Sequence, residues 1–102
     1  MKKCDTMELI HYIDEAHETA SKNGFWDDPN PNYAEKVMLI VTELSEAIQE
    51  DRKGEDPTPE IADVFIRLFD FCGRFHYPHI VDCIETKMKE NRTRPYKHNR
   101  RY

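Results

Sequence analysis

Apolar side chains recur every three to four positions over most of this chain, and they predict four helices. The expected helices cover residues 6–23, 33–52, 58–72 or slightly beyond, and 79–92. Apolar residues at this spacing line one side of an α-helix. No segment shows a competing strand pattern, and the breaks between helices are short. The pattern therefore predicts an all-α fold resembling a four-helix bundle.

Capping and turn residues mark the ends of these helices. Asp5 and Glu8 have the spacing of a capping box before the first helix, and Gly24 stops that helix. Asn32 is placed to cap the second helix. Pro59 opens the third helix at a position where proline is favoured. These signals agree with the boundaries that the apolar pattern predicts.

The second and third helices are apolar on more than one side. Residues 37–41, VMLIV, are apolar nearly all round, and the third helix is apolar over more than half of its circumference. We therefore expect the third helix to be deeply buried and the second to pack from two directions, which requires a partner subunit. The polar residues of the third helix lie in a stripe about 80° wide: Glu60, Asp63, Arg67, Asp70 and Arg74.

Both helices also carry a column of carboxylates. Glu43 and Glu46 are three positions apart on the second helix, and Glu60 and Asp63 are three apart on the third. Like charges at this spacing repel each other. If the two columns face each other, the acids take up protons or bind a divalent cation, and oxygen ligands suit Mg²⁺ or Mn²⁺. If they face water, they are solvated helix faces. Spacing alone leaves both interpretations open.

Length and charge bound the other possibilities. A chain of 102 residues with net charge −5 is typical of one domain, 1–102, and its modest core makes association reasonable. From residue 87 to the end there are seven basic residues and one acid, so a basic tail begins at about residue 93. Such a tail is either solvated or binds an anionic partner.

Cysteine usage and hydropathy predict the compartment. Cys4, Cys72 and Cys83 form no CxxC pair and their number is odd, so no disulfide framework is implied. The N-terminus has no apolar signal region, and no run approaches the length of a membrane span. We expect a soluble, cytoplasmic protein with no membrane partner.

The expected fourth helix adds two polar residues near its apolar side. Lys87 and Asn91 are four positions apart and fall on or beside the line defined by Ile80 and Ile84. A buried asparagine needs hydrogen-bond partners. Lys87 and Asn91 either point at an anionic ligand near a metal, or Asn91 only caps a frayed helix end.

Together these segments resemble the MazG-like all-α nucleoside triphosphate pyrophosphohydrolases. That family carries an E-x-x-E motif on one helix and an E-x-x-D motif on the next, and here these are ELSE at 43–46 and EIAD at 60–63. The family's K-x-x-x-N-x-x-R-P pattern is present at 87–95, and GFWDD at 24–28 is similar to a segment of smaller members. The resemblance covers about 24–98, and its specificity comes from the order and spacing of the motifs.

The resemblance implies a metal-dependent reaction. The Mg²⁺ ligands would be Glu43, Glu46, Glu60 and Asp63, with Mn²⁺ as a second choice of cation. Water would attack at the α–β phosphate linkage of a nucleoside triphosphate, releasing a nucleoside monophosphate and pyrophosphate. Glu43 or Glu46 would orient or deprotonate that water. Thr42 stands where many members have a further acid, so a second metal ion is not implied.

The same resemblance implies how substrate would be held. Lys87 and Arg94 would contact phosphate, and Asn91 would hydrogen-bond a phosphate or the sugar. Trp26 offers a surface on which a base can stack, although it and Phe25 could instead anchor their loop to the core. Family members are dimers or higher oligomers, so a homodimer or homotetramer is expected and nucleic acid is not an expected partner.

Three other interpretations of the sequence involve a different metal or no enzyme activity. A di-iron bundle requires two E-x-x-H motifs, which the sequence lacks. Zinc could be bound by two pairs with i, i+4 spacing, Cys72 with His76 and His79 with Cys83, but the spacing is unusual and structural packing is favoured. The non-enzymatic alternative is a dimeric helical binding protein that contacts nucleic acid or an acidic partner through its basic tail.

Overall fold

The computed structural model describes residues 6–96, which form four helices. These are α1 (Thr6–Lys22), α2 (Tyr33–Arg52), α3 (Thr58–Phe75) and α4 (His79–Thr93). No strand occurs among residues 6–96. The predicted all-α, four-helix fold is therefore confirmed. The largest boundary difference is at the end of α3, which continues one turn beyond Cys72.

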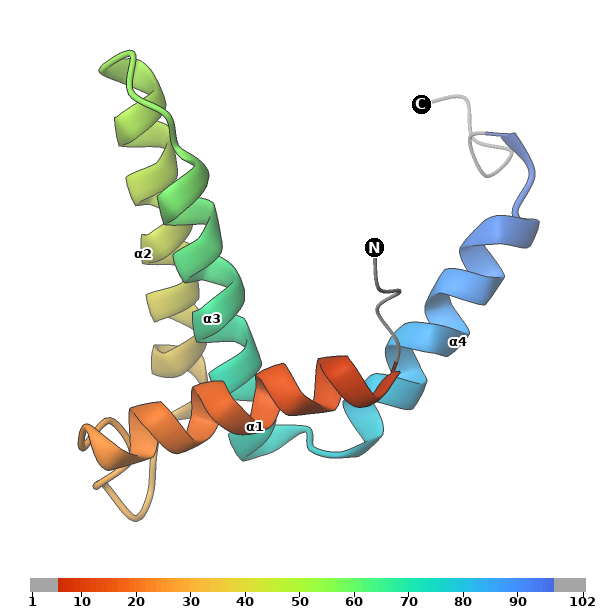
Figure 1. Ribbon diagram of the computed structural model, residues 1–102, viewed down its shortest axis with the longest axis horizontal. Helices are drawn as coiled ribbons and strands as arrows, with labels where there is room; N and C mark the ends of the chain where they lie inside the picture. The colour runs from red at the N-terminus through yellow and green to blue at the C-terminus, as the bar shows by residue number, and fades with distance from the viewer. Residues whose placement is uncertain (1–5, 97–102) are drawn as a thin grey trace.

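The helices form a hairpin, a crossing helix and a projecting helix. α2 and α3 run antiparallel, side by side, and α1 lies across the C-terminal end of α3 (Figure 1). α4 leads away from the hairpin and contacts α1 only weakly. The radius of gyration is 16.4 Å, whereas a compact chain of this length has about 13 Å. The four helices therefore do not close around a single core.

Local hydrogen bonds explain where the helices begin and end. The side chain of Asn32 accepts from the amide N–H of Glu35, which confirms the predicted cap of α2. Gly24 has φ of 86°, which lets the chain leave α1 through the left-handed region. At the start of α3, Asp56 accepts from the hydroxyl and amide of Thr58. The predicted capping box at Asp5 lies outside the described residues.

The core is centred on the crossing of α1 and α3. The buried apolar residues among the described part of the chain are Ile13, Ala47, Phe71, Cys72 and Val81. Gly73 allows the close approach, because a Cβ atom there would lie 2.7 Å from the Cβ of His17. This crossing fixes the orientation of the hairpin relative to α1 and so shapes the space between them.

The expectation that the third helix is deeply buried was wrong for the single chain. Ile61, Phe65, Ile66 and Leu68 of α3 are all more than one-third exposed. The physical reason is that α4, which would have to cover this side in a closed bundle, projects away from it (Figure 1). Apolar periodicity shows which side of a helix tends to be buried, but it does not show whether the same chain or a second chain packs against that side.

The long apolar side of α2 is also uncovered. Met38, Val41, Leu44 and Ile48 lie within an arc of about 120° and are 45–57% exposed. The buried Ala47 lies on the other side of the helix. Within residues 6–96, no helix is long and apolar enough to cross a membrane.

Candidate functional site

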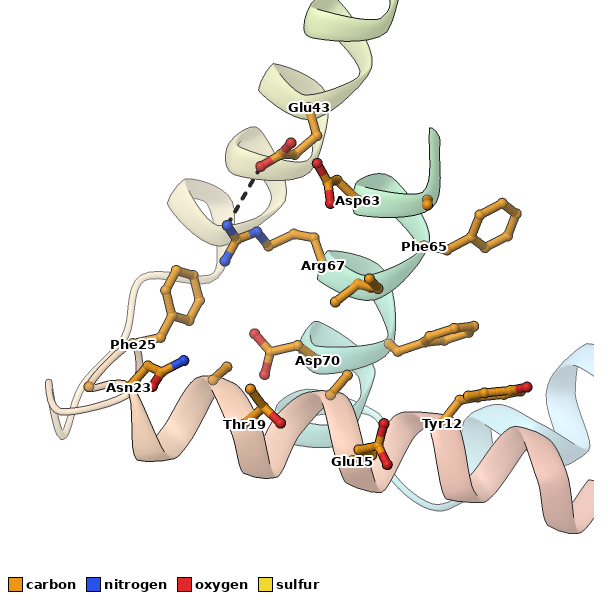
Figure 2. Close-up of a pocket in the computed structure, with 16 residues that line it drawn as sticks. Tyr12, Glu15, Thr19, Asn23, Phe25, Glu43, Asp63, Phe65, Arg67 and Asp70 are labelled. Carbon is orange, nitrogen blue, oxygen red and sulfur yellow. Dashed lines mark ion pairs between the residues drawn. The ribbon is translucent and has the colours of Figure 1, made fainter. Parts of the chain in front are cut away.

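The α2–α3 hairpin brings the two predicted acidic motifs together. Glu43 on α2 and Asp63 on α3 lie on facing sides of the hairpin (Figure 2). Glu46 lies one turn beyond Glu43 on α2, and Glu60 lies one turn before Asp63 on α3. Because the two helices run antiparallel, these positions come into register. The hairpin thus converts two motifs separated in sequence into one acidic cluster, Glu43, Glu46, Glu60 and Asp63.

The electrostatic coupling within this acidic cluster is clearest at Glu46. The negative charge of Glu43 is the largest cause that raises the pKa of Glu46 above its ordinary value. Partial desolvation and a side-chain hydrogen bond with Glu43 raise it further, followed by the charges of Asp63 and Glu60. Like charges disfavour ionisation of a neighbouring carboxyl group. The charge of each of the other three acids therefore acts on Glu46.

Glu60 is influenced from the turn as well as from the cluster. Desolvation is the main cause that raises its pKa, and the charges of Glu50, Asp63 and Asp56 add to it. Lys53 opposes this effect and also pairs with Glu50 at 3.3 Å. Glu50, which the sequence placed outside the four-residue motifs, thus affects the cluster through its charge.

One arginine provides a counter-charge inside the site. Arg67 Nη2 lies 3.6 Å from Glu43 Oε1, and the guanidinium carbon lies 4.6 Å from the centre of the Phe25 ring. Lys36 Nζ lies 4.0 Å from the centre of the same ring. Phe25 therefore contacts two cations, while Arg67 joins the loop to the acidic cluster (Figure 2).

The donor chemistry of the acidic cluster suits a hard divalent cation. Its four side chains offer only carboxylate oxygens, which Mg²⁺ and Mn²⁺ prefer, and their mutual repulsion favours a bound cation. In the arrangement described for residues 6–96, no three His, Cys, Asp or Glu side chains converge closely enough to hold a metal ion. The acidic cluster therefore has the oxygen ligands that a divalent cation needs, but these side chains are not close enough together to bind one. Arg67 also pairs with one of them, Glu43.

The candidate zinc residues do not form a cluster either. His76 and His79 have ring centres 6.2 Å apart, and His76 Nε2 lies 2.8 Å from the hydroxyl of Tyr33. Cys72 is buried and Cys83 is exposed. Cys72 and His76 pack against neighbouring side chains, as the structural interpretation expects, whereas Cys83 is exposed.

Trp26 lies in a different setting from the open stacking surface that was considered. Its indole N–H donates to Asp70 Oδ1 at 2.7 Å, and its ring packs edge-on against Phe75. Phe25, rather than Trp26, lines the cleft described below. These contacts favour the anchoring role for Trp26, with Phe25 presented to the site.

Asp70 is the main residue whose position the sequence did not predict. The sequence places it only on the polar stripe of the third helix, but it is buried, with 2% of its surface exposed. His17 Nδ1 lies 2.9 Å from its Oδ1, beside the Trp26 bond. His17 and Trp26 are 53 and 44 residues away, respectively. Sequence gave one hint, since Asp70 continues the polar stripe two turns after Asp63.

The three predicted phosphate-binding residues do not meet the acidic cluster within one chain. Lys87 and Asn91 lie on α4 and Arg94 directly follows it, and all three are exposed. α4 diverges from the α2–α3 hairpin (Figure 1). Asn91 is therefore not a buried core residue, and these three residues remain a prediction about the assembled site.

A cleft of about 990 Å³ runs between α1 and α3 and ends at the acidic cluster. Its polar end contains Glu43, Asp63 and Arg67. Much of the remainder is apolar or aromatic (Figure 2). The sequence identified the acids but not this cleft, because α1 lies far from α3 along the chain. The residues that complete the lining are Tyr12, Glu15, Ala16, Thr19, Ala20, Asn23, Gly24, Phe25, Ala62, Phe65, Ile66, Phe69 and Asp70.

Comparisons with models of known protein families, with curated proteins and with solved structures gave no match.

Proposed function

We propose that this protein is a magnesium-dependent nucleoside triphosphate pyrophosphohydrolase of the kind its motifs resemble. The observation that carries the proposal is the acidic cluster: the hairpin places both motifs so that three other acids raise the pKa of Glu46. Glu43 acts on Glu46 from the same helix, whereas Asp63 and Glu60 act on it from α3. The contribution from the second helix is what the hairpin adds to a solvated acidic face. A bound cation would relieve the repulsion, so the cluster is better suited to a metal than to bulk water.

The proposed reaction is hydrolysis at the α–β phosphate linkage. When bound, Mg²⁺, or Mn²⁺ in its place, would polarise a phosphate oxygen and neutralise developing charge. Glu46 or Glu43 would orient the attacking water and accept its proton. The products would be a nucleoside monophosphate and pyrophosphate.

The shape of the cleft supports a nucleotide as substrate. Its volume of about 990 Å³ lies within the range of small-molecule sites, about 300–1,000 Å³. The acidic end of the cleft would hold the metal and phosphates, and the apolar part beside Phe65 and Phe69 would hold the base. Arg67 lies between the two parts, where a guanidinium can pair with phosphate.

The proposed enzyme is a homodimer or homotetramer. Two uncovered apolar sides, on α2 and α3, favour association with a second copy of the chain. The projecting α4 would then bring Lys87, Asn91 and Arg94 to the acidic cluster of a neighbouring subunit. This arrangement reconciles the exposed position of α4 with the phosphate-binding role that the motif implies.

Substitution of two acids tests the proposed reaction. Glu43→Gln and Asp63→Asn keep side-chain size and remove one charge each, so each should lower magnesium-dependent pyrophosphate release by at least about a hundredfold. The assay is release of pyrophosphate from a panel of canonical and modified nucleoside triphosphates. Asp51→Asn, an exposed acid of α2, is the matched control and should retain activity.

Thermal unfolding provides a readout that does not depend on turnover. Millimolar Mg²⁺ should raise the melting temperature of the native protein, because the cation binds only the folded acidic cluster. Glu43→Gln and Asp63→Asn should reduce that shift, and Asp51→Asn should retain it. Full activity in both cluster variants would contradict the metal assignment. No turnover of any triphosphate, with salt-sensitive binding of nucleic acid, would favour the alternative of a helical binding protein.

A further inference from the structure

The part of the cleft away from the acidic cluster has the form of a slot for a flat ligand. Tyr12 and Phe69 stack with ring centres 5.9 Å apart and an interplanar angle of 11°. The small side chains of Ala16 and Ala20 line the α1 side of the cleft. Phe25 lies at the loop side (Figure 2). Tyr12 stands on the same helix as these alanines, and its stack with Phe69 of α3 closes one end of the cleft. The small side chains beside this aromatic pair leave space that suits a planar heterocycle.

Asp70 places a carboxylate with one unpaired oxygen in the wall of this slot. Its Oδ1 atom is bonded to two partners, Trp26 Nε1 at 2.7 Å and His17 Nδ1 at 2.9 Å. Its Oδ2 atom is buried and has no hydrogen-bond donor among residues 6–96. Burying an acceptor without a partner is costly, so native proteins rarely do so without a reason. A ligand that enters the cleft beside Asp70 with an N–H or O–H group directed at Oδ2 would supply the missing donor.

The two bonds to Oδ1 hold the carboxylate in one orientation. Trp26 comes from the loop and His17 from α1, so two separate elements fix the side chain from outside the slot. Figure 2 shows Asp70 projecting from α3 into the space beside Phe25 and above Thr19. A preorganised acceptor of this kind discriminates between ligands better than a free surface carboxylate, because it does not reorient to suit each one.

We propose that Asp70 is a specificity-determining residue that accepts a hydrogen bond from an N–H group of the nucleobase. This inference rests on the proposed function for its substrate class and extends it to base recognition. An ionised carboxylate oxygen is only an acceptor, so the matching group is an exocyclic amino group or a ring N–H. A base whose N–H groups are methylated leaves Oδ2 unpaired and is rejected.

Nucleosides test this proposal without metal or phosphate. Binding to the full chain is measured by NMR titration for two pairs: thymidine against its analogue methylated at the ring N–H, and adenosine against its analogue with a dimethylated amino group. For at least one pair the parent should bind about tenfold to a hundredfold more tightly, because hydrogen bonds to charged groups are the stronger class. Equal binding within both pairs, or no binding of any nucleoside at millimolar concentration, overturns the proposal.

The variant Asp70→Asn assigns the effect to this residue. Its amide oxygen can still accept from Trp26 and His17, while its NH₂ group replaces Oδ2 in the slot, so the preference for the parent nucleoside should be lost or reversed. Glu15→Gln, which removes an exposed carboxylate from the rim of the same cleft, should keep the preference. An undiminished preference in a folded Asp70→Asn protein overturns the proposal, and the comparison of nucleosides on the native protein stands even if this variant does not fold.

The results separate this proposal from the proposed enzyme activity. If the protein discriminates between the nucleosides but releases no pyrophosphate from any triphosphate, the proposed base recognition is supported and the proposed reaction is contradicted. If the protein releases pyrophosphate equally from parent and methylated triphosphates, and also binds their nucleosides equally, the proposed reaction is supported. The proposal that Asp70 determines base specificity is then contradicted.

Discussion

At the scale of single residues, a few charged side chains have their states set by close neighbours. Glu46 is coupled to three other acids, and Arg67 pairs with Glu43 across the hairpin. Asp70 is held by two ring N–H groups and keeps one oxygen unpaired. Glu43 acts on Glu46 within α2, whereas Arg67 and the two partners of Asp70 act from different segments of the chain.

The coupling at Glu46 predicts a pH dependence of stability. Its pKa is raised in the folded protein, so the folded state binds the proton more tightly than the unfolded state does. Metal-free protein should therefore lose stability as the pH rises from the ordinary pKa of glutamate to the raised value, and no further above it. Glu43→Gln removes the largest cause, so it should lower the pKa of Glu46 and flatten this decline.

Titration of the side-chain carboxyl of Glu46 by carbon-13 NMR measures its pKa in the native and Glu43→Gln proteins. Thermal melts across the same pH range measure how steeply the stability of each protein falls. Glu18→Gln on α1, far from the cluster in sequence and exposed, is a suitable control. An unchanged pKa for Glu46 in the Glu43→Gln protein would show that the two acids are not coupled.

Individual residues were predictable from the sequence where the partner was local. The Asn32 cap was predicted from its place before the second helix and is confirmed. The spacing of Glu43 and Glu46 predicted only that they share one side of α2. The position of Asp70 was not predictable, because its partners are His17 and Trp26, on segments with no periodic relation to α3. Spacing places a residue on a side of its own helix, but burial depends on which element covers that side.

At the scale of elements, the position of α1 against α3 depends on one glycine. A Cβ atom on Gly73 would meet the Cβ of His17 at 2.7 Å, well inside normal contact. An alanine there would gain about 1 kcal/mol of helix propensity. The forced separation of two helices should cost about 1–3 kcal/mol. The two effects oppose each other, and we expect the packing cost to be larger.

Gly73→Ala should therefore lower the free energy of unfolding, by up to about 2 kcal/mol, as measured by urea denaturation. The same variant should weaken the His17 contact to Asp70, because it moves α1 away from α3. A protein that becomes about 1 kcal/mol more stable would show that α1 adjusts freely and that propensity dominates.

The elements themselves were well predicted. All four helices were expected, and the start of α2 and its end at Arg52 agree with the prediction. These boundaries depend on caps, glycine and proline, which act over a few residues. The relative placement of α1 and α4 was not predictable in the same way, because it depends on contacts such as that of Gly73 with His17.

At the scale of the whole molecule, the open arrangement leaves apolar surface without cover. Met38 and Ile48, each more than half exposed, lie at the two ends of the uncovered side of α2. Exposed patches of this kind are typical of association surfaces. The all-α class followed from periodicity, whereas the open shape did not, because the same apolar side can be covered within one chain or by another.

Met38→Glu and Ile48→Glu should each weaken self-association by at least about tenfold, since each places a charge on the apolar side of α2 that the proposed interface would cover. Sedimentation velocity over a range of concentrations measures the change, and Ser21→Glu on exposed α1 surface is the control. Native protein that remains a monomer at every concentration would contradict the proposed homodimer or homotetramer.

The bond between Trp26 and Asp70 has one more consequence, for how the cleft can be observed. The sequence contains a single tryptophan, so all indole fluorescence arises from this position. Its N–H bond to Asp70 Oδ1 makes the emission sensitive to the charge and hydration of that carboxylate. A ligand that reaches Asp70 should therefore shift the emission spectrum of the unlabelled protein, and Asp70→Asn should abolish the shift. The molecule carries its own optical probe of the cleft, and a stopped-flow instrument could follow ligand entry through it.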